Sequence, residues 1–147
     1  MRGALSRVAD VPGHLVFEQE TALLYIADTG NNRIAVLDTT SGTRANNLSS
    51  SEWGVDHYRV EGAALWTLID GESFGMSQPS GLALVDGVLL VTDHDTGTVY
   101  GFDTSGKLLD WLDTGLGSGA LMGITARSLE DVWMVDARRD EVLRLQP

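Results

Sequence analysis

Leu23-Leu24-Tyr25-Ile26-Ala27-Asp28 recurs as Val88-Leu89-Leu90-Val91-Thr92-Asp93 and again as Asp131-Val132-Trp133-Met134-Val135-Asp136. Five residues after each closing Asp a second apolar run begins, at Arg33–Leu37, Thr98–Phe102 and Glu141–Leu145. A shorter run precedes each stretch, at Pro12-Gly13-His14-Leu15, Pro79-Ser80-Gly81-Leu82 and Leu121-Met122-Gly123-Ile124. The runs are short and rich in β-branched, aromatic and Leu residues, which predicts strands. Units of this size bury their apolar faces only by stacking on one another, so the repeat indicates three stacked sheets.

A fourth apolar run completes the first two units. Ala64–Asp70 follows the first unit and Lys107–Asp113 follows the second, whereas the third unit ends at Pro147 without such a run. Ala4–Asp10 shows the same pattern ahead of the first unit. We therefore predict a strand at residues 4–10 that completes the last sheet from the other end of the chain.

The turn between the first two long runs is the most specific part of the repeat. Ile26-Ala27-Asp28-Thr29-Gly30-Asn31-Asn32-Arg33-Ile34-Ala35-Val36-Leu37-Asp38 closely resembles the NHL repeat, in which a strand ends in Ala-Asp and a Gly/Asn turn leads to Arg-Ile and a new strand. The stretches Thr92–Val99 and Val135–Val142 resemble it less closely. The resemblance implies a β-propeller, commonly six-bladed, with four antiparallel strands in each blade. The expected fold class is all-β, with three four-stranded blades per chain, which is half of a six-bladed ring.

Residues 1–147 are expected to form one propeller unit, interrupted by an insertion at residues 43–63. Three blades are too few to close, because propellers have about four to eight blades. Either the sequence is a piece of a longer protein or two copies assemble head to tail, and we predict the homodimer. The insertion is rich in Ser and Asn before Trp53, and Tyr58–Gly62 alternates in a way that indicates a short extra strand or a lengthened hairpin.

The three recurring aspartates are predicted to stabilise turns. Asp28, Asp93 and Asp136 each stand at a strand end, where a carboxylate accepts hydrogen bonds from the backbone N–H groups of the turn. Thr29-Gly30-Asn31-Asn32 favours a tight reversal, since Gly and Asn tolerate a positive φ.

Charge and composition exclude several partner classes. The chain has 147 residues, a formal net charge of −11 and no cysteine. An acidic field repels phosphate backbones, so we expect no nucleic-acid partner. There is no apolar run long enough to span a bilayer, and Ser6, Arg7 and Asp10 interrupt what would be the core of a signal peptide. We expect a soluble protein with no membrane partner, either cytoplasmic or, if the chain is a piece of a longer protein, secreted.

Strand direction brings a set of polar residues to one rim of the predicted ring. The predicted ligand-binding residues are His14, Asn31, Asn32, His94 and Asp95. His14 and His94 are also the candidate metal ligands, because imidazole and neighbouring carboxylates suit zinc or another divalent ion. Asp93-His94-Asp95-Thr96-Gly97 additionally resembles the start of a calcium loop, although Thr104 stands where such a loop needs Glu. A turn histidine bonded to backbone is the alternative role of His14.

Two functions follow from these observations. The first is a non-catalytic propeller module without a cofactor, which binds a protein, a peptide or a small ligand at the rim. The second is a metal-dependent lyase or hydrolase, because the NHL resemblance extends to amidating lyases that hold a central metal with histidines. His14 stands where the other units have Gly81 and Gly123, so one chain lacks the three-histidine ring of those lyases. No nucleophile elbow or phosphate-binding loop is present.

Overall fold

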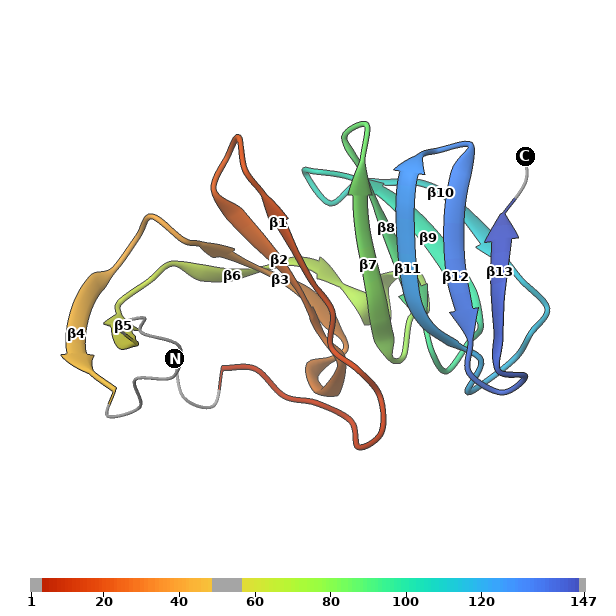
Figure 1. The fold of residues 1–147 in the computed structure, drawn as a ribbon, viewed down its shortest axis with the longest axis horizontal. Coiled ribbons are helices and arrows are strands. Elements are labelled where there is room, and N and C mark those ends of the chain that lie inside the picture. The colour runs from red at the N-terminus through yellow and green to blue at the C-terminus, as the bar shows by residue number, and fades with distance from the viewer. Residues whose placement is uncertain (1–3, 49–56, 146–147) are drawn as a thin grey trace.

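The computed structural model describes residues 4–48 and 57–145, and these residues form an all-β chain of separate antiparallel sheets (Figure 1). The first sheet has the strand order β1-β2-β3-β6, the second β7-β8-β9-β10 and the third β11-β12-β13. The strands of the first sheet are β1 (Leu15–Glu18), β2 (Leu23–Asp28), β3 (Arg33–Asp38) and β6 (Leu65–Asp70). Those of the second are β7 (Pro79–Val85), β8 (Val88–Asp93), β9 (Thr98–Asp103) and β10 (Leu108–Asp113), and those of the third are β11 (Leu121–Ser128), β12 (Asp131–Asp136) and β13 (Glu141–Leu145).

The three sheets stack through their first strands. β7 contacts β1 and β2 on one side and β11 on the other. Each sheet is an antiparallel meander. Consecutive strands pair in all three sheets except at β3 and β6, which residues 39–64 separate, so elsewhere the turn chemistry read from the sequence decides the topology locally. The predicted strands of the repeat are confirmed, including β2, β8 and β12 with their closing aspartates.

Two apolar cores lie between neighbouring sheets. The first core joins the first and second sheets, with Tyr25, Ile34 and Phe102 almost fully buried. The second core joins the second and third sheets and contains Leu90, Leu121 and Val132. Because side chains alternate across a strand, β7, β8 and β9 of the second sheet each contribute to both cores. This explains why its strands are nearly continuous apolar runs, as is usual for sheets covered on both faces.

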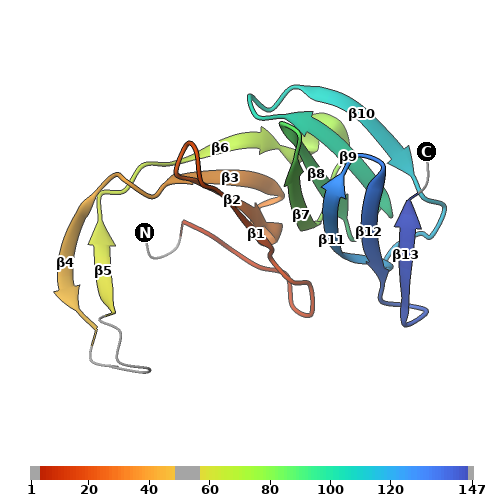
Figure 2. The same cartoon turned by 45° about the horizontal axis from the view of Figure 1, so that its top comes forward.

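The insertion forms a two-stranded hairpin of β4 (Thr43–Asn47) and β5 (Tyr58–Glu61), as the alternation at Tyr58–Gly62 indicated. The hairpin extends away from the three stacked sheets in both views (Figures 1 and 2). The Arg44 guanidinium lies 4.2 Å from the centre of the Tyr58 ring across the pair. Trp53, which the sequence places in the same insertion, lies outside the described residues.

Residues 4–10 contain no strand in this single chain, and their completion of the last sheet of a ring stays a prediction. The segment lies across the end of the first sheet instead. The backbone N–H of Ser6 donates to Asp28, the carbonyl of Ser6 accepts from Gly30, and the carbonyl of Ala4 accepts from Arg33. The connection of this segment to the first sheet is short: only residues 11–14 separate Asp10 from Leu15, whereas residues 71–81 separate the end of β6 from Leu82, the corresponding position of the second sheet.

No helix in the described part of the chain is long and apolar enough to cross a membrane.

Candidate functional site

The closing aspartates of β2, β8 and β12 are buried and hold the turns that follow them. Asp93 is fully buried and accepts hydrogen bonds from the backbone N–H groups of Ser77 (2.5 Å), Gln78 (3.2 Å), Asp95 (2.9 Å) and Thr96 (3.0 Å). It thereby joins the β8–β9 turn to the segment that leads into β7. The predicted turn-stabilising role is confirmed at this position.

Asp28 and Asp136 perform the same role with different partners. Asp28 accepts from the Ser6 backbone N–H at 2.7 Å and forms an ion pair with Arg33, whose Nε lies 2.6 Å from Oδ2. Asp136 accepts from the backbone N–H of Arg138 at 3.0 Å. The number of backbone donors therefore differs between the repeats.

The predicted ligand-binding residues of the turns make internal hydrogen bonds. The Asn31 side chain donates to Asp28 at 2.8 Å, and the Asn32 side chain donates to the carbonyl of Met76 at 2.8 Å. Asn32 adopts a left-handed conformation at the end of the turn, which Asn tolerates well. Asp95 accepts from the Ser118 hydroxyl at 2.9 Å. These contacts give each of the three residues a structural role.

The two histidines of the predicted rim both lie against β11. His94 Nδ1 is 3.0 Å from the carbonyl oxygen of Leu121. The backbone N–H of His94 donates to the carbonyl of Gln78, and the carbonyl of His94 accepts from the backbone N–H of Gly119. The His14 ring lies against Gly123, where a Cβ would come 3.1 Å from Cε1. A glycine at this position therefore leaves the space that the imidazole occupies.

His14 borders a small apolar cavity of about 240 Å³, lined also by Trp133, Val135 and Val142. Burial among these groups lowers the pKa of the His14 imidazole below its usual 6.5, since desolvation disfavours the charged form. The ring is therefore neutral at pH 7.

The residues around His14 and His94 do not assemble a metal site within one copy of the chain. Across residues 4–48 and 57–145, no three His, Cys, Asp or Glu side chains are grouped so that they could hold an ion. One nitrogen of His94 already faces a backbone carbonyl, and the cavity beside His14 is lined mainly by apolar side chains. This donor set does not fit zinc, which takes four ligands in structural sites and three protein ligands in catalytic ones.

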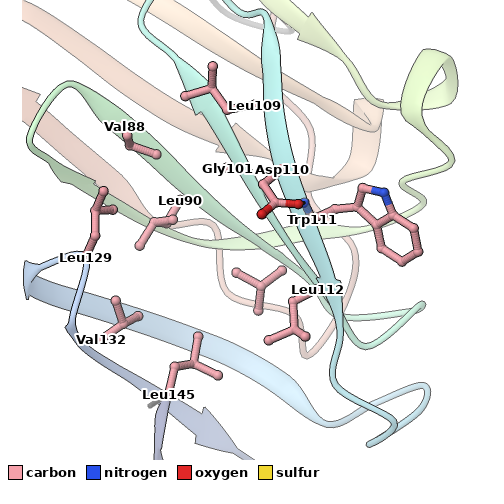
Figure 3. Close-up of a pocket in the computed structure, with 11 residues that line it drawn as sticks. Val88, Leu90, Gly101, Leu109, Asp110, Trp111, Leu112, Leu129, Val132 and Leu145 are labelled. Carbon is pink, nitrogen blue, oxygen red and sulfur yellow. The ribbon is translucent and has the colours of Figure 1, made fainter. Parts of the chain in front are cut away.

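A larger apolar groove lies elsewhere, between the outer halves of the second and third sheets (Figure 3). Its volume is about 510 Å³. From the second sheet it is lined by Val88, Leu90, Val99, Gly101, Leu109, Asp110, Trp111 and Leu112, and from the third by Leu129, Val132 and Leu145. In Figure 3 the side chains of Leu90, Val132 and Leu145 point into the space between the sheets, whereas the Trp111 ring points away from it.

Within the described residues the third sheet has three strands, whereas the first and second sheets have four each. In the first sheet, the outer strand β6 places Leu68 and Ile69 against the first core, beside Phe102 and Leu108 of the second sheet. The third sheet ends at β13, so nothing in the described chain covers Leu109 and Leu112, which are 51% and 46% exposed. Gly101 leaves room at the floor of the groove, because the atoms nearest to a Cβ there, from Val88, Leu90 and the backbone of Asp110, would all lie at 3.5 Å or more.

Two sheet faces at the ends of the stack are also open. On the first sheet, Val16 packs on the first core, so Leu15 and Phe17 point the other way and are 61% and 54% exposed. We call this the N-terminal open face. On the third sheet, Trp133, Val135 and Val142 lie opposite the second core and are all exposed, which we call the C-terminal open face.

The groove residues are not among the ligand-binding residues predicted from the sequence. The signal was present, since the third unit lacks the fourth run found at Ala64–Asp70 and Lys107–Asp113. The side chains that line the groove come from both sheets, however, and only the packing of the two sheets brings them together.

No family model and no curated protein sequence matches this chain.

Proposed function

We propose that the chain is an NHL-type propeller module of three blades and that it acts by binding rather than by catalysis. Three features support the blade arrangement: the repeated meander, the stacking of the sheets through β1, β7 and β11, and the buried Asp at the end of each second strand. The binding role is supported by one observation above the others, the apolar groove of about 510 Å³. Grooves of this size and composition are typical of ligand sites.

We propose further that two copies join head to tail into a six-bladed ring. The N-terminal open face would meet the partner's C-terminal open face, and two equivalent contacts would close the ring. Both faces expose apolar side chains that a monomer would leave in water, among them Phe17 and Val142. The groove lies on the other side of the third sheet from the C-terminal open face, so ring closure leaves it accessible.

The proposed binding function is tested by titrating the protein with a small apolar fragment, indole, and following backbone amide NMR shifts. Binding in the groove shifts residues such as Leu112 and Leu145. The original prediction of a rim site requires shifts at His14, Asn31 and His94 instead. Shifts at neither place would contradict a binding module.

A further inference from the structure

A third cavity lies at the outer margin of the first core, between the first and second sheets, and has a volume of about 400 Å³. One wall is the short helical turn Gly71–Phe74, which follows β6, and the other is one face of the β9–β10 pair. The two sheets that border it both have four strands. We call it the aromatic cavity, and its lining residues are Ser73, Phe74, Thr98, Tyr100, Leu108, Trp111 and Asp113.

Strand register places four of these residues on one face of the second sheet. Tyr100 pairs with Trp111, and Thr98 pairs with Asp113. Tyr100 belongs to the first core, whereas its neighbour Val99 belongs to the second, so both pairs face the first sheet. The Trp111 ring accordingly points away from the groove in Figure 3. The aromatic cavity and the groove therefore lie on opposite faces of the second sheet.

The core holds two of the three aromatic walls in fixed orientations. The fully buried Phe102 ring stacks on the Tyr100 ring with an interplanar angle of 24°. Phe74 meets the same Phe102 ring edge-on, at an interplanar angle of 77° and with ring centres 5.1 Å apart. The Phe74 and Tyr100 rings are therefore steeply inclined to each other and form a corner. Trp111 is the third wall, and it is 60% exposed.

The charged side chain that lines the aromatic cavity is a carboxylate. Asp113 accepts a hydrogen bond from one backbone N–H group at 2.9 Å, and none of the ion pairs between described residues involves it. Burial raises the pKa of the Tyr100 hydroxyl, and the nearby Asp93 carboxylate raises it further. Negative charge therefore lies both at the mouth of the cavity and behind one of its walls. No Lys, Arg or His is among the described residues that line it.

Three aromatic walls and a carboxylate favour a cation that needs few hydrogen-bond acceptors. Aromatic ring faces attract cations, and the attraction is greater where water is excluded. A primary ammonium group has three N–H donors that lose water on entry, which is costly unless each finds an acceptor. A quaternary ammonium group has no N–H donor and avoids that cost. The net charge of −11 also favours the approach of a cation over that of an anion.

We propose that the aromatic cavity binds the quaternary ammonium group of a small organic cation. Phe74, Tyr100 and Trp111 surround its methyl groups, and Asp113 is the counter-ion. The volume of about 400 Å³ is within the range of small-molecule sites. This site goes beyond the proposed function, because it is separate from the groove and takes a different class of ligand.

The probe is choline chloride, titrated into the full chain at constant ionic strength and followed by NMR and by calorimetry. We expect saturable shifts of the Trp111 indole N–H and of the Phe74 and Thr98 backbone amides. The neutral alcohol in which a carbon atom replaces the nitrogen of choline has the same shape without the charge, and it should bind about tenfold more weakly. Phosphocholine should also bind more weakly than choline, because Asp113 repels its phosphate. This comparison distinguishes a free cation from a lipid headgroup.

Protein variants test the role of each wall. Trp111→Leu keeps an apolar side chain but removes the ring face, and it should weaken choline binding about tenfold, whereas Trp111→Phe should restore most of the affinity. Asp113→Asn keeps an acceptor for the backbone N–H and removes the charge, which should weaken binding about fivefold. Asp86→Asn is the matched control, since it removes the same charge from an exposed turn between β7 and β8 and should leave binding unchanged. Trp111 and Asp113 are both exposed, so circular dichroism should show that the fold is retained.

The proposal is overturned if the neutral alcohol or phosphocholine binds as tightly as choline. It is also overturned if choline gives no saturable shift at Trp111, or if Asp86→Asn weakens binding as much as Asp113→Asn does. Indole binding in the groove without choline binding overturns this site alone and leaves the proposed binding function standing. Choline binding that Trp111→Leu and Asp113→Asn both weaken supports the site whatever occupies the groove.

Discussion

Asp93 shows how one side chain can determine the position of two segments. Its buried carboxylate accepts four backbone N–H groups, two from the approach to β7 and two from the β8–β9 turn. Removing it leaves those donors without an acceptor in a buried place, which costs more than the loss of a single exposed hydrogen bond.

We therefore expect Asp93→Ala to lower the free energy of unfolding by about 3 kcal/mol. Asp136→Ala, which removes one backbone partner, should cost about 1 kcal/mol by analogy with helix caps. Urea denaturation measures both values, and Asp93→Asn, which keeps one acceptor oxygen, should lie between them. Equal losses for the two alanine variants would contradict the hydrogen-bond explanation.

The burial of His14 predicts that the stability of the fold depends on pH. Burial lowers its pKa in the folded chain below 6.5, so the unfolded chain binds the proton more tightly. Stability therefore falls as the pH drops through 6.5 towards the folded pKa, and is retained above 6.5. Compared with His14→Gln, the unaltered protein should lose stability over this range in urea melts at pH 7.5, 6.5 and 5.5. Parallel pH profiles for the two proteins would show that His14 is solvated.

At the scale of elements, the β4–β5 hairpin stands apart from the cores. None of the described residues of β4 and β5 belongs to either apolar core. Its two ends meet at Gly42, where a Cβ would lie 2.8 Å from the backbone N of Ala63.

Replacing residues 43–62 with Asn-Gly should leave the free energy of unfolding within about 1 kcal/mol of the original, because β4 and β5 contribute to neither core and a change of loop length costs little. Thermal and urea melts measure the effect, with circular dichroism as the check on the fold. A loss of several kcal/mol would mean that the hairpin packs on the sheets.

Gly101, at the floor of the groove, also affects the stability of the second sheet. Gly101 lies inside β9, where glycine is a weak strand former, and its surroundings leave room for a side chain. Gly101→Val should raise the free energy of unfolding by about 1 kcal/mol through added apolar contact and strand propensity. Gly81→Val is the contrasting variant, because a Cβ there would lie 2.9 Å from the backbone N of Ile124. Destabilisation by both variants to the same extent would show that the groove is closed in solution.

At the scale of the whole molecule, the open faces predict assembly. Light scattering should give a mass twice the 15.8 kDa of one chain. Phe17→Arg and Val142→Arg, on opposite open faces, should each give monomers, while Thr104→Arg in an exposed turn should not.

An equimolar mixture of the two arginine variants should recover dimers, because one head-to-tail contact then joins two unaltered faces. Monomers of the unaltered chain at micromolar concentrations would contradict the assembly. Failure of the mixture to recover would contradict its head-to-tail arrangement.

Local sequence determined the strands and their pairing. Alternation, short apolar runs and Gly/Asn turns fixed β2–β3, β8–β9 and β12–β13, since a meander joins neighbours in the chain through turns whose chemistry is local. The bonds of Asp93 and Asp136 to the turns that follow them were likewise predictable, because those donors are two or three residues away. The bonds of Asp28 to Ser6 and of Asp93 to Ser77 and Gln78 join distant segments and were not. The candidate metal ligands His14 and His94 follow from their predicted position at the rim and from the ligand chemistry of imidazole and neighbouring carboxylates, and neither tells what surrounds each ring.

Only the tertiary structure decided the rest. The segment at residues 4–10 resembles β6 and β10 in sequence, yet in this chain it is hydrogen-bonded to the end of the first sheet through Ser6. The groove is formed by side chains of two sheets, and only the packing of those sheets brings them together. Sequence periodicity reports how one strand alternates and pairs within its own sheet. A groove between two sheets depends on how those sheets pack against each other, which the pattern of a single strand does not report.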